Sequence, residues 1–194
     1  MTRREIVSSA AEALLLVDEQ DREIGVESKQ ACHAGGGLLH RAFSIFLFNS
    51  QDELLLQKRS AQKPLWPSYW SNTCCSHPRA GETMEQAVAR RLAEELGIQC
   101  TLRFLYKFKY HAAYGSLGSE REYCWVYVGH YDGHPRVNLN EIADWRYVDV
   151  SSFDAELAAA PERFTPWLKL EWAEIKQAHL PQILGSAGSQ QLVN

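Results

Sequence analysis

A change of hydrophobic period at Gly81 constrains the fold of this chain more than any other sequence feature. From Glu82 to Gly97 the sequence reads ETMEQAVARRLAEELG, and its apolar residues recur at spacings of three and four. These spacings place them on one helix face: Met84, Ala87, Val88, Leu92 and Leu96. Gly97 supplies the stop signal of the helix. The helix must therefore bury this stripe against its neighbours.

Strand-like segments precede and follow this helix. RAFSIFLFN and ELLLQKR, which are separated by Ser50-Gln51-Asp52, predict a hairpin of two buried strands. We expect further strands at 101–109 and 122–131, the first of them extending around Cys100. Ser151 or Ser152 is expected to cap FDAELAAA, and a last helix follows in TPWLKLEWAEIKQA. The alternation predicts an α/β fold with a central mixed sheet between helices.

Composition limits the class of protein. With 194 residues, 45% of them apolar, the chain suits one domain over residues 1–194, with a core at about 14–175 and a flexible tail at about 180–194. A net charge of −4 argues against a nucleic-acid partner. The run AEALLLV is too short for a membrane span or a secretory signal. Five scattered cysteines predict free thiols, and we expect a cytoplasmic protein.

Histidines and paired carboxylates suggest a metal site. In an extended strand, Glu120, Glu122 and Cys124 would share one face, and two such carboxylates either lie in solvent or are held together by a cation. His33 and His40 flank a loop with three glycines, and His77 ends the stretch NTCCSH. Imidazole and carboxylate ligands together suit a divalent ion such as Mg²⁺ or Mn²⁺.

The helix region resembles the Nudix box, G-x5-E-x7-R-E-U-x-E-E-x-G-U, in which U is a bulky aliphatic residue. Seven positions match: Glu82, Arg90, Leu92, Glu94, Glu95, Gly97 and Ile98. Ser76 replaces the first glycine, and Arg91 replaces the first glutamate of the helix. In typical members that glutamate helps to assemble the metal cluster that hydrolyses a diphosphate. The replacement implies a site that holds a diphosphate without cleaving it.

Further motifs narrow the resemblance. WPSYWSNTCCSHP, EREYC, FTPW and the spacing of Lys29, His33 and His40 before Arg41-Ala-Phe43 occur in the order and spacing of type 1 isopentenyl-diphosphate isomerase. The chain is similar to that family from about residue 14 to 175. The resemblance implies a Nudix-like α/β/α sandwich and an isomerase that interconverts isopentenyl and dimethylallyl diphosphate through a carbocation-like intermediate.

The resemblance also implies roles for individual residues. Cys75 and Glu122 would be the pair of residues that transfer protons. Cys75 would be partly ionised to a thiolate, and Glu122 would be held by the hydroxyl of Tyr110. Trp167 would face the carbocation. One divalent ion (Mn²⁺, Mg²⁺ or Zn²⁺) would be held by His33, His40, His77, Glu120 and Glu122. Glu95 would hold a Mg²⁺ that arrives with the substrate. The diphosphate would be bound by Lys29, Arg59, Lys63 and Arg91.

Two other hypotheses remain open at this stage. One is a Nudix hydrolase of nucleoside diphosphate derivatives, against which Arg91 counts. The other is a structural zinc site without turnover, closed by Cys75, His77, His33 and His40. Cys74 lies at a position that the isomerase family does not require, and we expect it to be structural. The substrate would be a small diphosphate, and the protein a monomer or weak homodimer.

Overall fold

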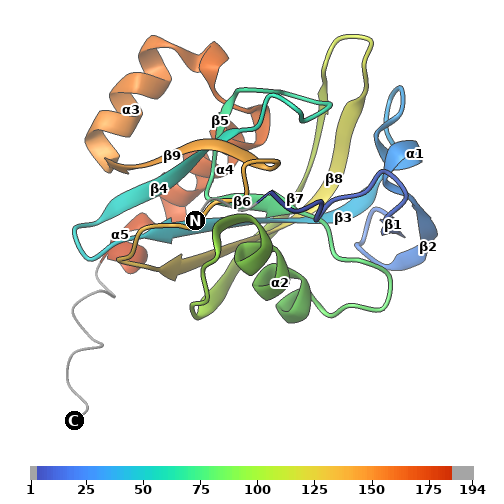
Figure 1. Ribbon diagram of the computed structural model, residues 1–194, viewed down its shortest axis with the longest axis horizontal. Coiled ribbons are helices and arrows are strands. Elements are labelled where there is room, and N and C mark those ends of the chain that lie inside the picture. Colours follow the sequence, from blue (N-terminus) through green and yellow to red (C-terminus); the bar gives the residue numbers. More distant parts are fainter. Residues whose placement is uncertain (1–3, 185–194) are drawn as a thin grey trace.

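A computed structural model describes residues 4–184 and shows a nine-stranded mixed sheet between helices (Figure 1). The strands are β1 (Ala13–Val17), β2 (Glu23–Ser28), β3 (His40–Phe48), β4 (Glu53–Arg59), β5 (Trp70–Ser71), β6 (Cys74–Ser76), β7 (Leu102–Ala113), β8 (Ser119–His130) and β9 (Ile142–Asp149). The helices are α1 (Lys29–His33), α2 (Met84–Leu96), α3 (Val150–Ala159), the 3-10 turn η1 (Pro161–Arg163), α4 (Pro166–Glu174), the π turn η2 (Ile175–His179) and α5 (Leu180–Leu184). The predicted α/β/α sandwich is confirmed.

Strand β3 is the centre of the sheet and is buried on both faces. Phe43, Ile45 and Leu47 pack with the apolar stripe of α2, whereas Phe46 and Phe48 pack with residues of α3, α4 and α5. Side chains alternate across a strand, so an uninterrupted apolar run indicates helices on both faces of the sheet. Figure 1 shows α2 and α3 on opposite sides of the sheet.

The two buried strands predicted as a hairpin are confirmed as β3 and β4, which are antiparallel neighbours, but their pairing is confined to the turn. The two strands pair only at Phe48 and Leu54, beside the connection. β3 then pairs in parallel with β8 over its whole length, and β6 pairs antiparallel with three of its residues. β4 diverges to pair with β9 and β5. Both edges of β3 are occupied, and that long-range pairing displaces the local one.

The predicted helix at 82–97 is confirmed. Its five stripe residues are all buried, and Gly97 ends the helix in the left-handed conformation at φ 66°. Thr83 caps the other end, where its side chain accepts from the Gln86 N–H and the Gln86 side chain accepts from the Thr83 N–H. Two terminal donors are thereby satisfied, which fixes the start of the helix.

Three local expectations differ from the structure. The cap of α3 is Asp149, whose carboxylate accepts from the Ser152 N–H at 2.9 Å, and not Ser151 or Ser152 themselves. Cys100 lies half-buried in the connection before β7 rather than in a strand. Helix α5 occupies the start of the expected flexible tail and buries Ile183, and residues 185–194 lie outside the described part.

The positions of the cysteines agree with the expectation of free thiols. All five are unpaired in the structure. Cys32, Cys74 and Cys124 are fully or almost fully buried. Separately, none of the helices between residues 4 and 184 combines the length and apolar character that a membrane crossing requires.

Candidate active site

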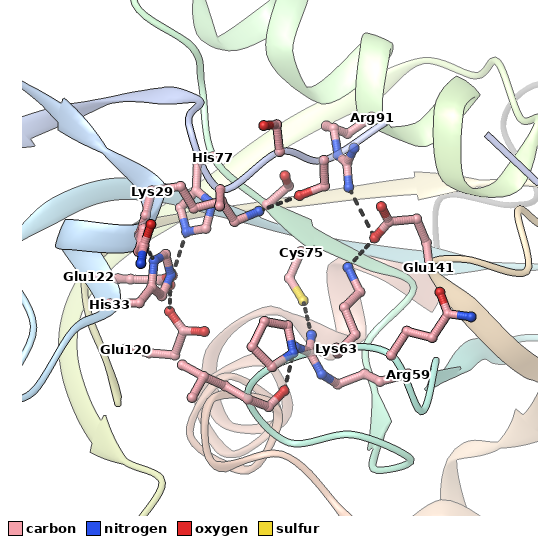
Figure 2. Close-up of a pocket in the computed structure, with 18 of the residues that line it drawn as sticks. Lys29, His33, Arg59, Lys63, Cys75, His77, Arg91, Glu120, Glu122 and Glu141 are labelled. Atoms are coloured by element: carbon pink, nitrogen blue, oxygen red, sulfur yellow. Dashed lines mark hydrogen bonds and ion pairs between the residues drawn. The ribbon is translucent and has the colours of Figure 1, made fainter. Parts of the chain in front are cut away.

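One cavity of about 660 Å³ collects most of the residues singled out in the sequence (Figure 2). Its wall is formed by the N-terminal segment, α1, the loop after β4, β6, α2, the β7–β8 hairpin and the start of α4. Eleven of the predicted site residues line it: Lys29, His33, Arg59, Lys63, Cys75, His77, Arg91, Tyr110, Glu120, Glu122 and Trp167. The other two, His40 and Glu95, are buried and do not line the cavity.

Five of the predicted metal ligands form one cluster. His33, His40, His77, Glu120 and Glu122 can each offer a ligand atom, and these atoms lie within 4.8 Å of one another. Strand register explains the meeting, because His40 is the parallel partner of Glu122 and their side chains share one face. Glu120 and Glu122 are both buried there, so the predicted alternation along β8 is confirmed.

The triple glycine returns the chain from α1 to β3 and brings two histidines together. Gly35 and Gly37 have φ values of 55° and 72°, which non-glycine residues seldom adopt. The turn brings the rings of His33 and His40 to 4.8 Å between centroids although they lie seven residues apart. The run is therefore a tight turn that builds the ligand cluster.

Hydrogen bonds orient two of these imidazoles toward the centre of the cluster. His33 Nδ1 donates to the Lys29 carbonyl and His40 Nδ1 to the Leu38 carbonyl, both at 2.7 Å. A carbonyl only accepts, so each Nδ1 carries a proton and each Nε2 is turned toward the cluster, where that of His33 lies 2.7 Å from Glu120 Oε2. The buried His40 Nε2 has no hydrogen-bond partner among the described residues. A divalent ion would satisfy these atoms, and the residues present fit one.

Electrostatics in the cluster also suit a cation. Burial and the neighbouring His40 lower the pKa of His77 well below its usual value, which keeps its imidazole neutral. Burial alone would raise the pKa of Glu122, but the neighbouring imidazole of His40 and the hydrogen bond from Tyr110 outweigh it, and the pKa is lowered. The Tyr110 hydroxyl donates to Glu122 Oε2 at 2.6 Å. A neutral imidazole beside an ionised carboxylate is the state that binds metal.

Strand register also separates the two adjacent cysteines. Cys74 is paired with Ile45 and Cys75 with Ser44, so the two thiols point to opposite faces of the sheet. Cys74 is 0% exposed in the apolar core under α2. Cys75 lines the cavity instead. The expectation that Cys74 is structural agrees with this position.

Cys75 differs from expectation in its ionisation. Its Sγ lies 3.9 Å from Arg59 Nη1 and 3.9 Å from Ser71 Oγ. Burial is the largest influence and raises the pKa of the Cys75 thiol to about 12, although Arg59 acts in the opposite direction. The side chain is a neutral thiol at pH 7 and not the partial thiolate that we expected. It therefore holds a proton beside the cavity.

Aromatic side chains enclose the cavity next to Cys75. The Trp167 indole lies edge-on to Trp66 at 5.2 Å and near Tyr110 at 6.3 Å between ring centroids. Its Nε1 donates to Ser71 Oγ at 3.0 Å, which fixes the ring plane. Leu65 completes the cluster. Such a wall excludes water and presents π faces, both of which stabilise a bound carbocation.

Four cations also line the cavity: Lys29, Arg59, Lys63 and Arg91. Arg59 donates to the carbonyls of Leu65 and Trp66, at 2.9 and 3.0 Å. Lys29 donates to Ser8 Oγ at 2.6 Å and lies 3.7 Å from Glu12. Burial and the neighbouring Lys63 lower the pKa of Lys29. These contacts hold cationic groups in a fixed arrangement, as an anionic ligand requires.

The last two cations share carboxylates. Arg91 is 2% exposed, is hydrogen-bonded to Glu95 and lies 3.5 Å from Glu141 Oε2. Lys63 is hydrogen-bonded to the same Glu141 oxygen. Figure 2 shows Glu141 between these two cations. Glu95, the predicted Mg²⁺ ligand, is buried, is hydrogen-bonded to Arg91 and does not itself line the cavity.

Sequence reasoning missed Glu141 and Ser71. Glu141 lies outside every motif, and its position depends on the pairing of β9 with β4. Ser71 lies within the WPSYWSN stretch, but no spacing rule pointed to its bridge among Cys75, Trp167 and Thr165. The structural zinc hypothesis fails in its ligand set, because the cluster found among the described residues contains no cysteine.

Comparisons with known proteins agree with this geometry. Residues 38–168 match the NUDIX domain. Isopentenyl-diphosphate Delta-isomerase 1 of Photorhabdus laumondii is 42% identical over 174 residues, 89% of this chain and 99% of that protein. Its namesake in Aromatoleum aromaticum is 47% identical over 156 residues, 80% and 88% of the two chains. A solved structure from Deinococcus radiodurans is similar in fold, with a TM-score of 0.70 at 24% identity over 87% of this chain and 99% of that one.

Proposed function

Since this chain belongs to the isopentenyl-diphosphate isomerases of the Nudix family, we propose that it interconverts isopentenyl diphosphate and dimethylallyl diphosphate. The observation that carries this proposal is one cavity lined by a thiol, two carboxylates, an aromatic wall and four cations. The hydrocarbon part of such a substrate suits the aromatic wall beside the thiol, and its diphosphate suits the cations. The resemblance deduced from the motifs is thereby confirmed at the level of the family.

The reaction moves a double bond and needs two proton transfers. A proton is added to the terminal methylene of isopentenyl diphosphate, which leaves a tertiary carbocation, and a proton is then removed from the carbon two positions away. Cys75 and Glu122, two groups that can each hold a proton, would exchange these protons with the substrate. Tyr110 orients Glu122 through its hydroxyl. Trp167 would stabilise the cation by about 0.5 to 2 kcal/mol through its π face.

The histidine and glutamate cluster would hold one divalent ion, with Mn²⁺, Mg²⁺ and Zn²⁺ as candidates for its imidazole and carboxylate ligands. When bound, that ion supplies positive charge that holds Glu120 and Glu122 close together. A Mg²⁺ carried in with the diphosphate would be held with the help of Glu95. Lys29, Arg59, Lys63 and Arg91 would bind the phosphate oxygens by charge-assisted hydrogen bonds.

Incubation with isopentenyl diphosphate and Mg²⁺ in heavy water tests the activity. We expect dimethylallyl diphosphate that has gained deuterium, detected by mass spectrometry, because the added proton comes from an exchangeable enzyme group. Cys75→Ser and Glu122→Gln should remain folded and lose turnover by at least about a thousandfold. Cys74→Ser is the matched control, because that thiol faces the core, and it should retain deuterium incorporation.

The same preparations separate isomerisation from hydrolysis. A Nudix hydrolase would release phosphate or nucleoside monophosphate from nucleoside diphosphate derivatives in the presence of Mg²⁺. Arg91 argues against that activity, since it brings a positive charge to the helix position at which hydrolases of this family have a glutamate. Phosphate release without any deuterated dimethylallyl product would overturn the proposal in favour of a hydrolase.

A further inference from the structure

Glu141 is a buried carboxylate in a pocket that is built to receive an anion. It is 4% exposed and lines the cavity. Its Oε2 is hydrogen-bonded to Lys63 and lies 3.5 Å from Arg91 Nη2. A carboxylate among phosphate-binding cations repels the anion that those cations attract. Its presence there calls for a function that offsets this cost.

The backbone holds Glu141 firmly in this place. Its N–H donates to the Asn138 carbonyl and its carbonyl accepts from the Ser60 N–H, both at 2.9 Å. The next residue, Ile142, is the β9 partner of Arg59. Lys63 belongs to the turn that Ser60 starts, because its N–H donates to the Ser60 carbonyl at 3.1 Å. Glu141 and Lys63 are thus fixed relative to each other by one corner of the β4–β9 pair.

Carboxylates offset part of the positive charge in this part of the pocket before any ligand binds. Of the four cations Lys29, Arg59, Lys63 and Arg91, two pair with carboxylates that no other cation shares: Glu95 pairs with Arg91, and Glu141 with Lys63 and Arg91. Two formal positive charges are left over. Glu94 and Glu12 also reach Arg91 and Lys29 but are shared with Arg90 and Arg79. A diphosphate monoester carries about three negative charges at neutral pH, so about one would remain without compensation.

We propose that Glu141 sets the metal dependence of substrate binding: its carboxylate orients Lys63 and Arg91 and lowers the pocket's positive charge, so that a diphosphate binds well only with an accompanying divalent cation. This inference rests on the proposed function for the identity of the anion. The pocket selects a metal-bound diphosphate over a free one. Glu141 is accordingly a positioning and specificity-determining residue, and the proton transfers do not involve it.

Isothermal titration calorimetry with inorganic pyrophosphate tests this role without relying on turnover. Glu141→Gln keeps the shape and a hydrogen-bond acceptor for Lys63 but removes the charge. We expect its affinity for Mg²⁺-free pyrophosphate to rise about tenfold or more, and its affinity for Mg²⁺-pyrophosphate to change by less than about threefold. The preference for the metal-bound ligand should therefore fall about tenfold.

Two further variants complete the design. Glu141→Asp keeps the charge and should retain the Mg²⁺ preference of the wild type, even if both affinities fall. Glu156→Gln removes a carboxylate that pairs with Arg146 away from the cavity and controls for net charge. Equal changes of the metal-free and metal-bound affinities in Glu141→Gln, or loss of the preference in Glu141→Asp, would overturn the inference. Deuterium incorporation by the wild type reports on the proposed function independently.

Discussion

Glu171 gives the sharpest test of the electrostatics of this fold. It lies on α4, is 0% exposed and faces β3 and β8. Its Oε1 lies 3.5 Å from the Cys124 thiol, and its Oε2 has no hydrogen-bond partner among the described residues. Burial raises the pKa of Glu171 to about 8, and the charge of Glu122 adds to the rise, while hydrogen bonds with Ser44 and Cys124 oppose it.

The sign of the effect on stability follows from proton binding. Below pH 4.5, the ordinary value for the side chain, Glu171 is protonated in both folded and unfolded states and its ionisation does not affect folding. Between pH 4.5 and about 8 the unfolded chain releases the proton and the folded protein keeps it, so stability falls as the pH rises. At about 1.4 kcal/mol per pH unit, this loss amounts to about 3 kcal/mol at pH 7.

Glu171→Gln removes the titration and should remove this loss. We expect the free energy of unfolding of the variant, relative to the wild type, to increase by about 2.5 kcal/mol between pH 5 and pH 7, because a smaller part of the loss is already present at pH 5. Urea unfolding of both proteins at the two pH values, under the same metal conditions, measures this increase. Comparing the two pH values cancels any packing cost of the amide that does not depend on pH.

A matched control separates burial from helix effects. Glu174 lies three residues further along α4 and is exposed, so Glu174→Gln should show almost no such increase. An increase below about 0.5 kcal/mol for Glu171→Gln would refute the reasoning. It would mean that water or a rearranged partner stabilises the ionised carboxylate in the folded protein.

Two other substitutions probe the scaffold of the site. Gly118→Ala should weaken Mn²⁺ binding by about tenfold in calorimetry, because its Cβ would lie 2.5 Å from the carbonyl oxygen of His33, one of the proposed ligands. Gly115→Ala is the control, since Gly115 also has a positive φ but open space around its Cβ position. Equal weakening by both substitutions would contradict the clash. Asp21→Ala should lower the free energy of unfolding by about 3 kcal/mol, because its buried carboxylate accepts from Arg41, Lys107 and Trp125. Urea unfolding measures that loss, and Glu19→Ala is the control, because it removes only an exposed ion pair with Lys109 on the same turn. A loss below about 1 kcal/mol for Asp21→Ala would count against a structural role for Asp21.

The predictable parts of the fold are those that a local pattern determines. The stripe of α2 and the stop at Gly97 follow from the period of a helix, and the shared face of Glu120 and Glu122 follows from the period of a strand. The cap of α3 was misplaced by two or three residues, because Asp, Ser and Ser all suit a cap and only the backbone decides among them.

Pairing between distant strands could not be predicted from such patterns. β3 is apolar on both faces, so nothing in its sequence distinguishes β4 from β8 as its neighbour. That most of the proposed site residues lie together was predicted nonetheless, because family motifs retain which residues meet even where the strand order is unknown. Glu141 shows the limit of that route, since its role depends on a register and no motif includes it.

The register of β6 against β3 explains why the adjacent Cys74 and Cys75 lie in different surroundings. Successive residues of a strand point to opposite faces, so one of Cys74 and Cys75 must face α2 and the other must face α4. If the register moved by one residue, the Cys75 thiol would be buried under α2 and the Cys74 thiol would lie beside Trp167. Thr73 opposes such a shift, because its hydroxyl donates to the Leu55 carbonyl at 2.6 Å and accepts from the Leu47 N–H at 2.9 Å. The position of Cys75 in the cavity thus depends on a buried threonine that does not itself line the cavity.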